Sequence, residues 1–222
     1  MQSVRERVLN GALDGALSGL YGADALSGQR ERYLRLEQAF TAQFGARSDA
    51  AFFSAPGRSE IGGNHTDHQL GRVLAAAVTV DTLALAAPRD DRTVRIHSKG
   101  YPTLCVSLDG LAPDKQEQNA SEALVRGIAD GLTRRGWTVG GFDAATVSDV
   151  PKGSGLSSSA AFSILVCTIF SELFNGGKIP PVEQALASKY AENVYFGKPS
   201  GLMDQLACAV GGFVAIDFRN PE

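Results

Sequence analysis

The stretch from residue 142 to residue 174 constrains the fold of this chain more than any other part of the sequence. A strand-like segment at 142–150 leads into a turn with Gly153, Gly155 and four serines, and an apolar, helix-like segment follows at 156–174. A strand that ends in a glycine-rich turn before a helix leaves unpaired backbone N–H groups at the helix N-terminus, where the helix dipole is positive. Such a place attracts phosphate groups.

The serines of this turn allow two interpretations. Ser157, Ser158 and Ser159 can donate hydrogen bonds to phosphate oxygens or ligate Mg²⁺. Serine is also a favoured N-cap residue, so a turn rich in glycine and serine can simply cap the helix. One cap needs only one serine, but the turn lacks the Gly-Lys-Ser or Gly-Lys-Thr ending of a P-loop. Taken alone, the turn predicts either a phosphate-binding loop or an ordinary helix cap.

The rest of the chain predicts an α+β fold. Apolar residues recur at helical spacing from residue 30 to residue 44, where Gly45 ends the pattern. Further helices are expected at 120–135, 181–195 and 202–210, and strands at 51–55, 73–80, 82–87, 93–97, 104–108 and 213–217. Residues 1–28 have weak periodicity, so we expect an N-terminal extension without an assigned function, followed by one domain over 29–222.

Charge and cysteine content narrow the classes of partner. The 222 residues carry 21 basic and 24 acidic side chains, so there is no overall positive field for nucleic acid or a membrane surface. Cys105, Cys167 and Cys208 lie far apart among apolar neighbours, which predicts buried thiols in a reducing compartment. The most apolar stretch, 160–170, is too short to span a bilayer, and no signal-peptide pattern precedes it. We therefore expect a cytoplasmic protein whose partners are small molecules, with no nucleic acid and no membrane.

Two further stretches concentrate polar side chains. Residues 55–78 read APGRSEIGGNHTDHQLGRVLAAAV, and residues 190–212 read YAENVYFGKPSGLMDQLACAVGG. The first has more polar side chains between two predicted strands than a structural turn requires. In the second, Glu192 and Asp204 are each explained most simply as a solvated helix charge or a partner of the helix dipole. That simple explanation does not account for their combination with the glycine-rich turn.

The three stretches together resemble the successive N-terminal motifs of galactokinases: APGR…IG…HTDH…G.VL, P.GSGLSSSAA and AEN…G.PSGLMDQ. The match runs in order from about residue 53 to residue 217, and the superfamily includes homoserine, mevalonate and phosphomevalonate kinases. The resemblance implies an α+β fold, a mixed sheet with helices packed on one face, like the N-terminal (ribosomal protein S5 domain 2-like) domain of these kinases. It also implies a sugar 1-kinase that transfers the γ-phosphoryl group of ATP, with Mg²⁺, to the anomeric hydroxyl of galactose.

Individual roles follow from the same resemblance. Asp204 corresponds to the catalytic base, and Arg58 beside it stabilises charge on the transferred phosphoryl group. Ser159 and Glu192 correspond to the Mg²⁺ ligands, whose hard oxygen donors suit that ion. The residues that correspond to the nucleotide site are Gly153, Ser154, Gly155, Leu156, Ser157, Ser158 and Ser159, with Ser98 nearby. The residues that correspond to the sugar site are Asn64, His65, Thr66, Asp67 and Gly201.

One departure from the family pattern concerns the sugar. Galactokinases carry glutamate directly before His-Thr-Asp, where it accepts from the 6-hydroxyl, whereas this chain has Asn64. Asparagine can also donate, and it does not repel a carboxylate, so a hexuronate such as galacturonate is an alternative substrate. Ser59-Glu60, Gly63 and His68-Gln69 also depart from the usual residues.

The other departure is length. Galactokinases have a C-terminal domain that closes the cleft, and the resemblance predicts that this chain lacks it. An open cleft neither excludes water nor fixes in-line geometry, so we expect the chain alone to bind ligands weakly and catalyse little. A non-catalytic sugar sensor is the alternative from another class of function. The sequence predicts no oligomeric state.

Overall fold

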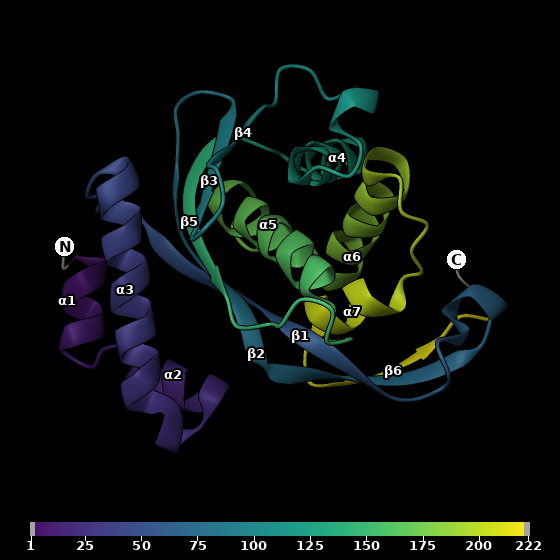
Figure 1. Ribbon diagram of the computed structural model, residues 1–222, viewed down its shortest axis with the longest axis horizontal. Helices are drawn as coiled ribbons and strands as arrows, with labels where there is room; N and C mark the ends of the chain where they lie inside the picture. Colours follow the sequence, from purple (N-terminus) through teal and green to yellow (C-terminus); the bar gives the residue numbers. More distant parts are fainter. Residues whose placement is uncertain (1–2, 220–222) are drawn as a thin grey trace.

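The structure is a computed structural model that describes residues 3–219 (Figure 1). A six-stranded mixed sheet has the order β1-β2-β5-β3-β4, and β6 pairs with β2 off this path. Strands β1 and β2 form a long antiparallel pair, while β3 runs parallel to β5. The strands are β1 (Ala51–Gly62), β2 (Arg72–Pro88), β3 (Thr93–Ser98), β4 (Leu104–Ser107), β5 (Phe142–Ser148) and β6 (Phe213–Asp217).

One face of the sheet carries the four helices of the main core. Helix α5 packs on β1 and β2, where Ala84 and Ala86 leave room for it, and its Phe170 ring packs edge-on against Phe142, with the ring centroids 5.3 Å apart. Figure 1 shows α4, α6 and α7 on the same side as α5. These helices are α4 (Ser121–Arg134), α5 (Ser158–Asn175), α6 (Pro181–Tyr190), continued by the π-helical turn η4 (Ala191–Phe196), and α7 (Met203–Val210). The predicted mixed sheet with a helical layer is confirmed.

The opposite face is covered as well, by helices near the N-terminus. Side chains of β2 alternate, so that Leu83 and Leu85 are buried on this second face in a cluster with Leu36 and Phe40 of α3. A strand that is apolar on both faces needs cover on both. The expectation of helices on one face was therefore incomplete, and the boundary expected at residue 28 falls inside α3. These elements are α1 (Val4–Leu9), α2 (Asp14–Tyr21), the 3₁₀ turn η1 (Ala23–Ala25) and α3 (Leu26–Phe44).

The structure also bears on two further expectations, one about the apolar segment that forms α5 and one about the cysteines. By length and composition α5 could cross a membrane, but more than half of it is buried inside the protein, as in the core helix of a soluble domain. Cys167 and Cys208 are buried as predicted. Cys105 is exposed, and the prediction was wrong there because β4 ends the sheet and its side chains alternate, with Val106 turned to the core and Cys105 to solvent.

Gly127 lets α4 lie against the π-helical turn η4. A Cβ atom at residue 127 would lie 2.8 Å from Cα of Ala191 and 2.8 Å from Cδ2 of Tyr195, so the two elements would have to separate. We expect Gly127→Ala to lower the free energy of unfolding by about 1–3 kcal/mol in urea denaturation, despite the better helix propensity of alanine. Gly28→Ala is the matched control, because no atom lies within 4 Å of its added Cβ in α3. That variant should be neutral or stabilised by up to about 1 kcal/mol, and equal losses in both variants would contradict the packing argument.

Candidate active site

The turn between β5 and α5 adopts a conformation that depends on its glycines. Gly153 has φ 72° and Gly155 has φ 78°, a left-handed backbone that residues with a Cβ rarely adopt. The hydroxyl of Ser154 donates to the carbonyl of Pro151 at 2.8 Å and accepts from the amide of Leu156 at 3.3 Å, which braces the turn. Ser157 is the N-cap residue, yet its side chain makes no capping hydrogen bond. The ordinary-cap interpretation of Ser157 is therefore wrong, and the turn leaves the start of α5 without a side-chain cap.

Arg58 of β1 joins this turn to the start of α7. Its Nε donates to Oδ1 of Asp204 at 2.7 Å, and its Nη1 donates to the carbonyl of Gly155 at 2.5 Å. The hydroxyl of Ser157 donates to the other carboxylate oxygen of Asp204, also at 2.5 Å. Gly57 makes the approach possible, because a Cβ there would lie 2.8 Å from the carbonyl oxygen of Leu156. Four predicted site residues from three separate stretches of the sequence thus form one hydrogen-bonded group.

Arg58 and Asp204 differ in exposure. The Arg58 side chain is buried, at 7% exposed, whereas the Asp204 side chain is 32% exposed. Buried Arg58 therefore fixes the carboxylate from inside the protein, while the carboxylate remains accessible to a ligand. This is the arrangement expected of a group that receives a proton from a bound hydroxyl.

Glu192, the other predicted acidic residue of the site, lies in the π-helical turn η4. Its side chain is buried, its Oε2 accepts from Nε2 of Gln205 at 3.1 Å, and its Oε1 has no hydrogen-bond partner. The pKa of the nearby Cys208 thiol is raised to about 12, mainly by burial and further by the negative charges of Asp204 and Glu192. The positive charge of Arg58 opposes this rise. The charges of Asp204, Glu192 and Arg58 therefore all lie close enough to Cys208 in α7 to change its pKa.

The donor set around Glu192 is compatible with a cation. A buried carboxylate oxygen without a partner is costly unless a cation or a donor reaches it, and π-helical turns are frequent at functional sites. Ser159, the other predicted ligand, lies exposed in the first turn of α5. Within residues 3–219 no group of three or more His, Cys, Asp and Glu side chains is placed to hold a metal by itself. A Mg²⁺ ion here would complete its shell with water and nucleotide oxygens, as this ion usually does.

Four of the five predicted sugar-contacting residues, all except Gly201, lie in the segment that follows β1. Asn64 and His65 both have left-handed backbones, with φ 54° and 50°, and the short 3₁₀ helix η2 (Thr66–Gln69) follows. Glu60 holds this turn: its Oε1 accepts from the amide of His65 at 3.0 Å, and its Oε2 lies 3.1 Å from Nε2 of the same residue. The sequence registered Glu60 only as a departure from the family pattern. Its spacing of five residues from His65 gave no signal for this contact.

Asp67 connects the sugar turn to α7. Its Oδ2 accepts from the amide of Met203 at 3.4 Å, and a Cβ added to Gly201 would overlap its carboxylate. Because Met203 directly precedes Asp204, the turn and the Arg58–Asp204 group lie side by side at the start of α7. Ser98 lies at the end of β3, where its hydroxyl is 2.6 Å from that of Thr146 on β5, the strand that leads into the glycine-rich turn.

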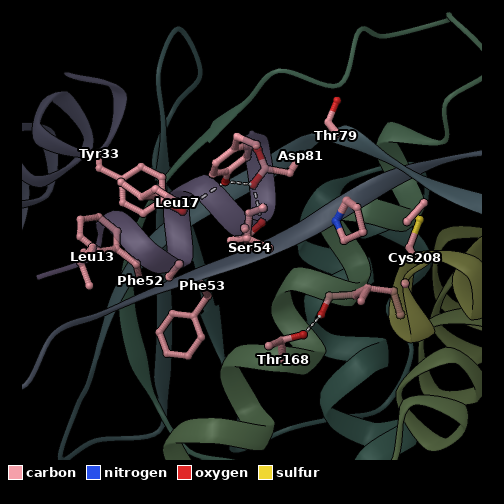
Figure 2. A pocket seen from close by; sticks show the side chains of 18 of the residues that line it. Leu13, Leu17, Tyr33, Phe52, Phe53, Ser54, Thr79, Asp81, Thr168 and Cys208 are labelled. Atoms are coloured by element: carbon pink, nitrogen blue, oxygen red, sulfur yellow. Dashed lines mark hydrogen bonds between the residues drawn. The ribbon is translucent and has the colours of Figure 1, made fainter. Parts of the chain in front are cut away.

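A groove of about 930 Å³ lies elsewhere, along the free edge of β1 (Figure 2). Tyr21, Ser54 and Asp81 line it on the side of the N-terminal helices, and Thr168 and Cys208 line it on the side of the core helices. None of the residues predicted for the site lines this groove. Most of the predicted site residues lie instead on the turn before α5, on the turn after β1 and at the start of α7.

Two family models match the chain over the segments that build this surface. The Galactokinase galactose-binding signature matches residues 38–88, and the GHMP kinases N terminal domain matches residues 123–212. The solved mevalonate kinase of Methanococcus jannaschii has the same fold, with a TM-score of 0.62 at 17% identity over 78% of this chain and 55% of that one. Fold and sequence are therefore similar to those of the N-terminal domains of GHMP kinases.

Within this class the similarity to galactokinases is higher. The galactokinases of Streptococcus mutans and Clostridium perfringens are both 37% identical over 180 residues, which is 79% of this chain and 45% and 46% of theirs. The Lactococcus lactis galactokinase, solved in complex with galactose, gives a TM-score of 0.78 at 30% identity over 85% of this chain and 50% of that one. The chain thus spans about half the length of the curated relatives it matches. The predicted relationship to the N-terminal part of the galactokinase family is confirmed.

Proposed function

We propose that this chain is the N-terminal domain of a cytoplasmic sugar 1-kinase, which transfers the γ-phosphoryl group of ATP to the anomeric hydroxyl of galactose. The observation that carries the proposal is the Arg58–Asp204–Ser157 group, which joins the glycine-rich turn to the start of α7. A phosphate-binding turn and an accessible carboxylate beside one guanidinium are the parts that phosphoryl transfer to a hydroxyl requires. The match to the galactose-binding signature supports the choice of sugar.

In this proposal each residue has a limited task. Backbone amides at the start of α5 and the serines of the turn hold the phosphates. Asp204 orients the anomeric hydroxyl and accepts its proton, and Arg58 keeps Asp204 in place and stabilises charge on the transferred group. Glu192 and Ser159 would hold Mg²⁺, which neutralises charge on the nucleotide phosphates when bound. Because the transition state of such transfers is loose, positioning matters more than the basicity of Asp204.

The charges around the sugar turn favour a neutral hexose over a hexuronate. Glu60 places a carboxylate against the amide of His65, the residue next to Asn64, and Asp67 adds a second carboxylate on the same turn. A carboxylate at C6 of the sugar would meet these negative charges in a partly desolvated site, which is unfavourable. The relatives matched are galactokinases, and neither the hexuronate kinase nor the sugar sensor gains support from them.

The test measures ADP release with MgATP and a panel of galactose, glucose and galacturonate. It uses both this chain and a longer form joined to the C-terminal half of a galactokinase such as that of Streptococcus mutans. We expect turnover with galactose in the longer form, little turnover in the chain alone, and at least about 100-fold lower kcat/KM for galacturonate. Turnover of galacturonate in preference to galactose would overturn the choice of sugar. Galactose binding without ADP release in the longer form would favour the sensor.

A further inference from the structure

The helices near the N-terminus are fastened to the sheet by a buried ion pair. Nη1 of Arg32 in α3 lies 2.6 Å from Oδ1 of Asp81 in β2, and both side chains are less than 8% exposed. The hydroxyl of Tyr21 donates to Oδ2 of Asp81 at 2.6 Å. Ser54 donates to the same oxygen (Figure 2). Burial and the hydrogen bond to Asp81 raise the pKa of the Tyr21 phenol, so this donor keeps its proton. The carboxylate of Asp81 is thus fully satisfied by groups from α2, α3 and β1.

The same arginine reaches the base of the glycine-rich turn. Nε of Arg32 lies 3.1 Å from Oδ2 of Asp149, the residue that directly follows β5. The amide of Asp149 donates to the carbonyl of Asp81 at 2.9 Å, and that carbonyl also accepts from Nη2 of Arg32 at 3.2 Å. Asp149 is therefore held by a hydrogen bond through its backbone, and its side chain lies within ion-pair distance of Arg32 without accepting a hydrogen bond from Nε, at the point where the chain enters the turn.

A purely structural role does not account for the second contact. Anchoring α3 requires only the buried pair with Asp81, whereas the side chain of Asp149 is 47% exposed and belongs to the turn. A carboxylate at the base of an anion-binding turn repels phosphate unless a cation balances it. Arg32 lies between the carboxylates of Asp81 and Asp149 and offsets part of their negative charge, while its buried side chain lies at the start of the turn.

We propose that Arg32 is a positioning residue, through which the helices near the N-terminus hold the glycine-rich turn in the conformation that receives the nucleotide phosphates. The inference gives a role to helices that the sequence left without one. Its kinetic part rests on the proposed kinase function, whereas its structural part does not.

The test compares Asp149→Asn and Arg32→Gln with Arg30→Gln as a matched control. Arg30 also lies on α3 and pairs with Asp14 of α2, with Nε 2.7 Å from Oδ1, but it has no contact with the turn. The first readout is hydrogen exchange, in the free chain, of the hydrogen-bonded amides of the turn and its base, those of Asp149, Val150 and Leu156. We expect both test variants to accelerate this exchange about tenfold, and the control to leave it unchanged. In the longer form, Arg32→Gln should raise the KM for ATP about tenfold, while the KM for galactose and kcat change little.

Asp149→Asn decides the outcome if Arg32→Gln fails to fold, because it leaves the buried pair with Asp81 intact. Wild-type exchange of the turn amides in folded Asp149→Asn would overturn the inference, whatever the activity. Faster exchange in a protein that phosphorylates no sugar would support the structural part and count against the proposed function instead. A rise in the KM for galactose equal to that for ATP would show a general loss of structure and would also overturn it.

Discussion

Asp204→Asn is expected to lower kcat for galactose by about 10²–10⁴-fold in the longer form, while the dissociation constant for galactose rises only a few-fold. The amide keeps the shape of the carboxylate. Its oxygen can still accept from Arg58 and its nitrogen can donate to the hydroxyl of Ser157, so the geometry around the start of α7 is retained. What is lost is the ability to take a proton from the anomeric hydroxyl. Steady-state ADP release and calorimetric titration of galactose measure the two effects separately.

Ser157→Ala is the matched control for this change. It removes one hydrogen bond to Asp204 but leaves the carboxylate and its contact with Arg58 in place. We expect a fall in kcat of roughly tenfold or less, as for the loss of one orienting hydrogen bond. A rate close to wild type in Asp204→Asn would remove Asp204 from the mechanism. Equal losses in the two variants would mean that orientation, and not proton acceptance, is its contribution.

The sequence predicted the elements of this fold well where a single pattern decided them. The strand, turn and apolar helix around Gly153 and Gly155 were predicted to within a few residues, because glycine punctuation and apolar spacing agree there. The prediction was wrong for β2. Asp81 interrupts its apolar run, so the pattern predicted two strands, yet the strand continues through it as one. It continues because Arg32, Tyr21 and Ser54 satisfy the buried carboxylate, and these partners are distant in sequence.

The candidate site likewise contains some residues that the sequence predicted and one that it missed. The family motifs predicted Arg58, Ser157 and Asp204, and the structure brings them into one group. Periodicity alone could not have paired residues 58 and 204, which read as unrelated polar positions. Glu60 was missed because its role depends on the left-handed turn at Asn64 and His65, where residues other than glycine rarely adopt that backbone. Contacts that need a rare backbone or a distant partner leave no local pattern.

Glu192→Gln is expected to lower kcat/KM for MgATP without lowering the free energy of unfolding. Oε1 of this buried carboxylate has no hydrogen-bond partner, so its charge is costly in the free protein unless a cation meets it. Glutamine removes the charge and can still pair with Gln205, whose own Oε1 lacks a partner. The free energy of unfolding without ligand should therefore stay unchanged or rise by about 1 kcal/mol. In the longer form, kcat/KM for MgATP should fall by about 100-fold or more.

Urea denaturation of the free chain measures the first effect, and a thermal shift on adding MgADP compared with ADP in EDTA measures the second without turnover. The wild-type shift should depend on Mg²⁺, whereas the shift in Glu192→Gln should be the same with and without the ion. Glu172→Gln is the control, since Glu172 lies on α5 but is absent from the Arg58–Asp204–Ser157 group. A loss of stability of 2 kcal/mol or more in Glu192→Gln, on the scale of a broken buried pair, would instead mean that the carboxylate is paired in the free protein. A retained Mg²⁺-dependent shift would place the ion elsewhere, and either result would require a different account of why this π-helical turn buries an acid.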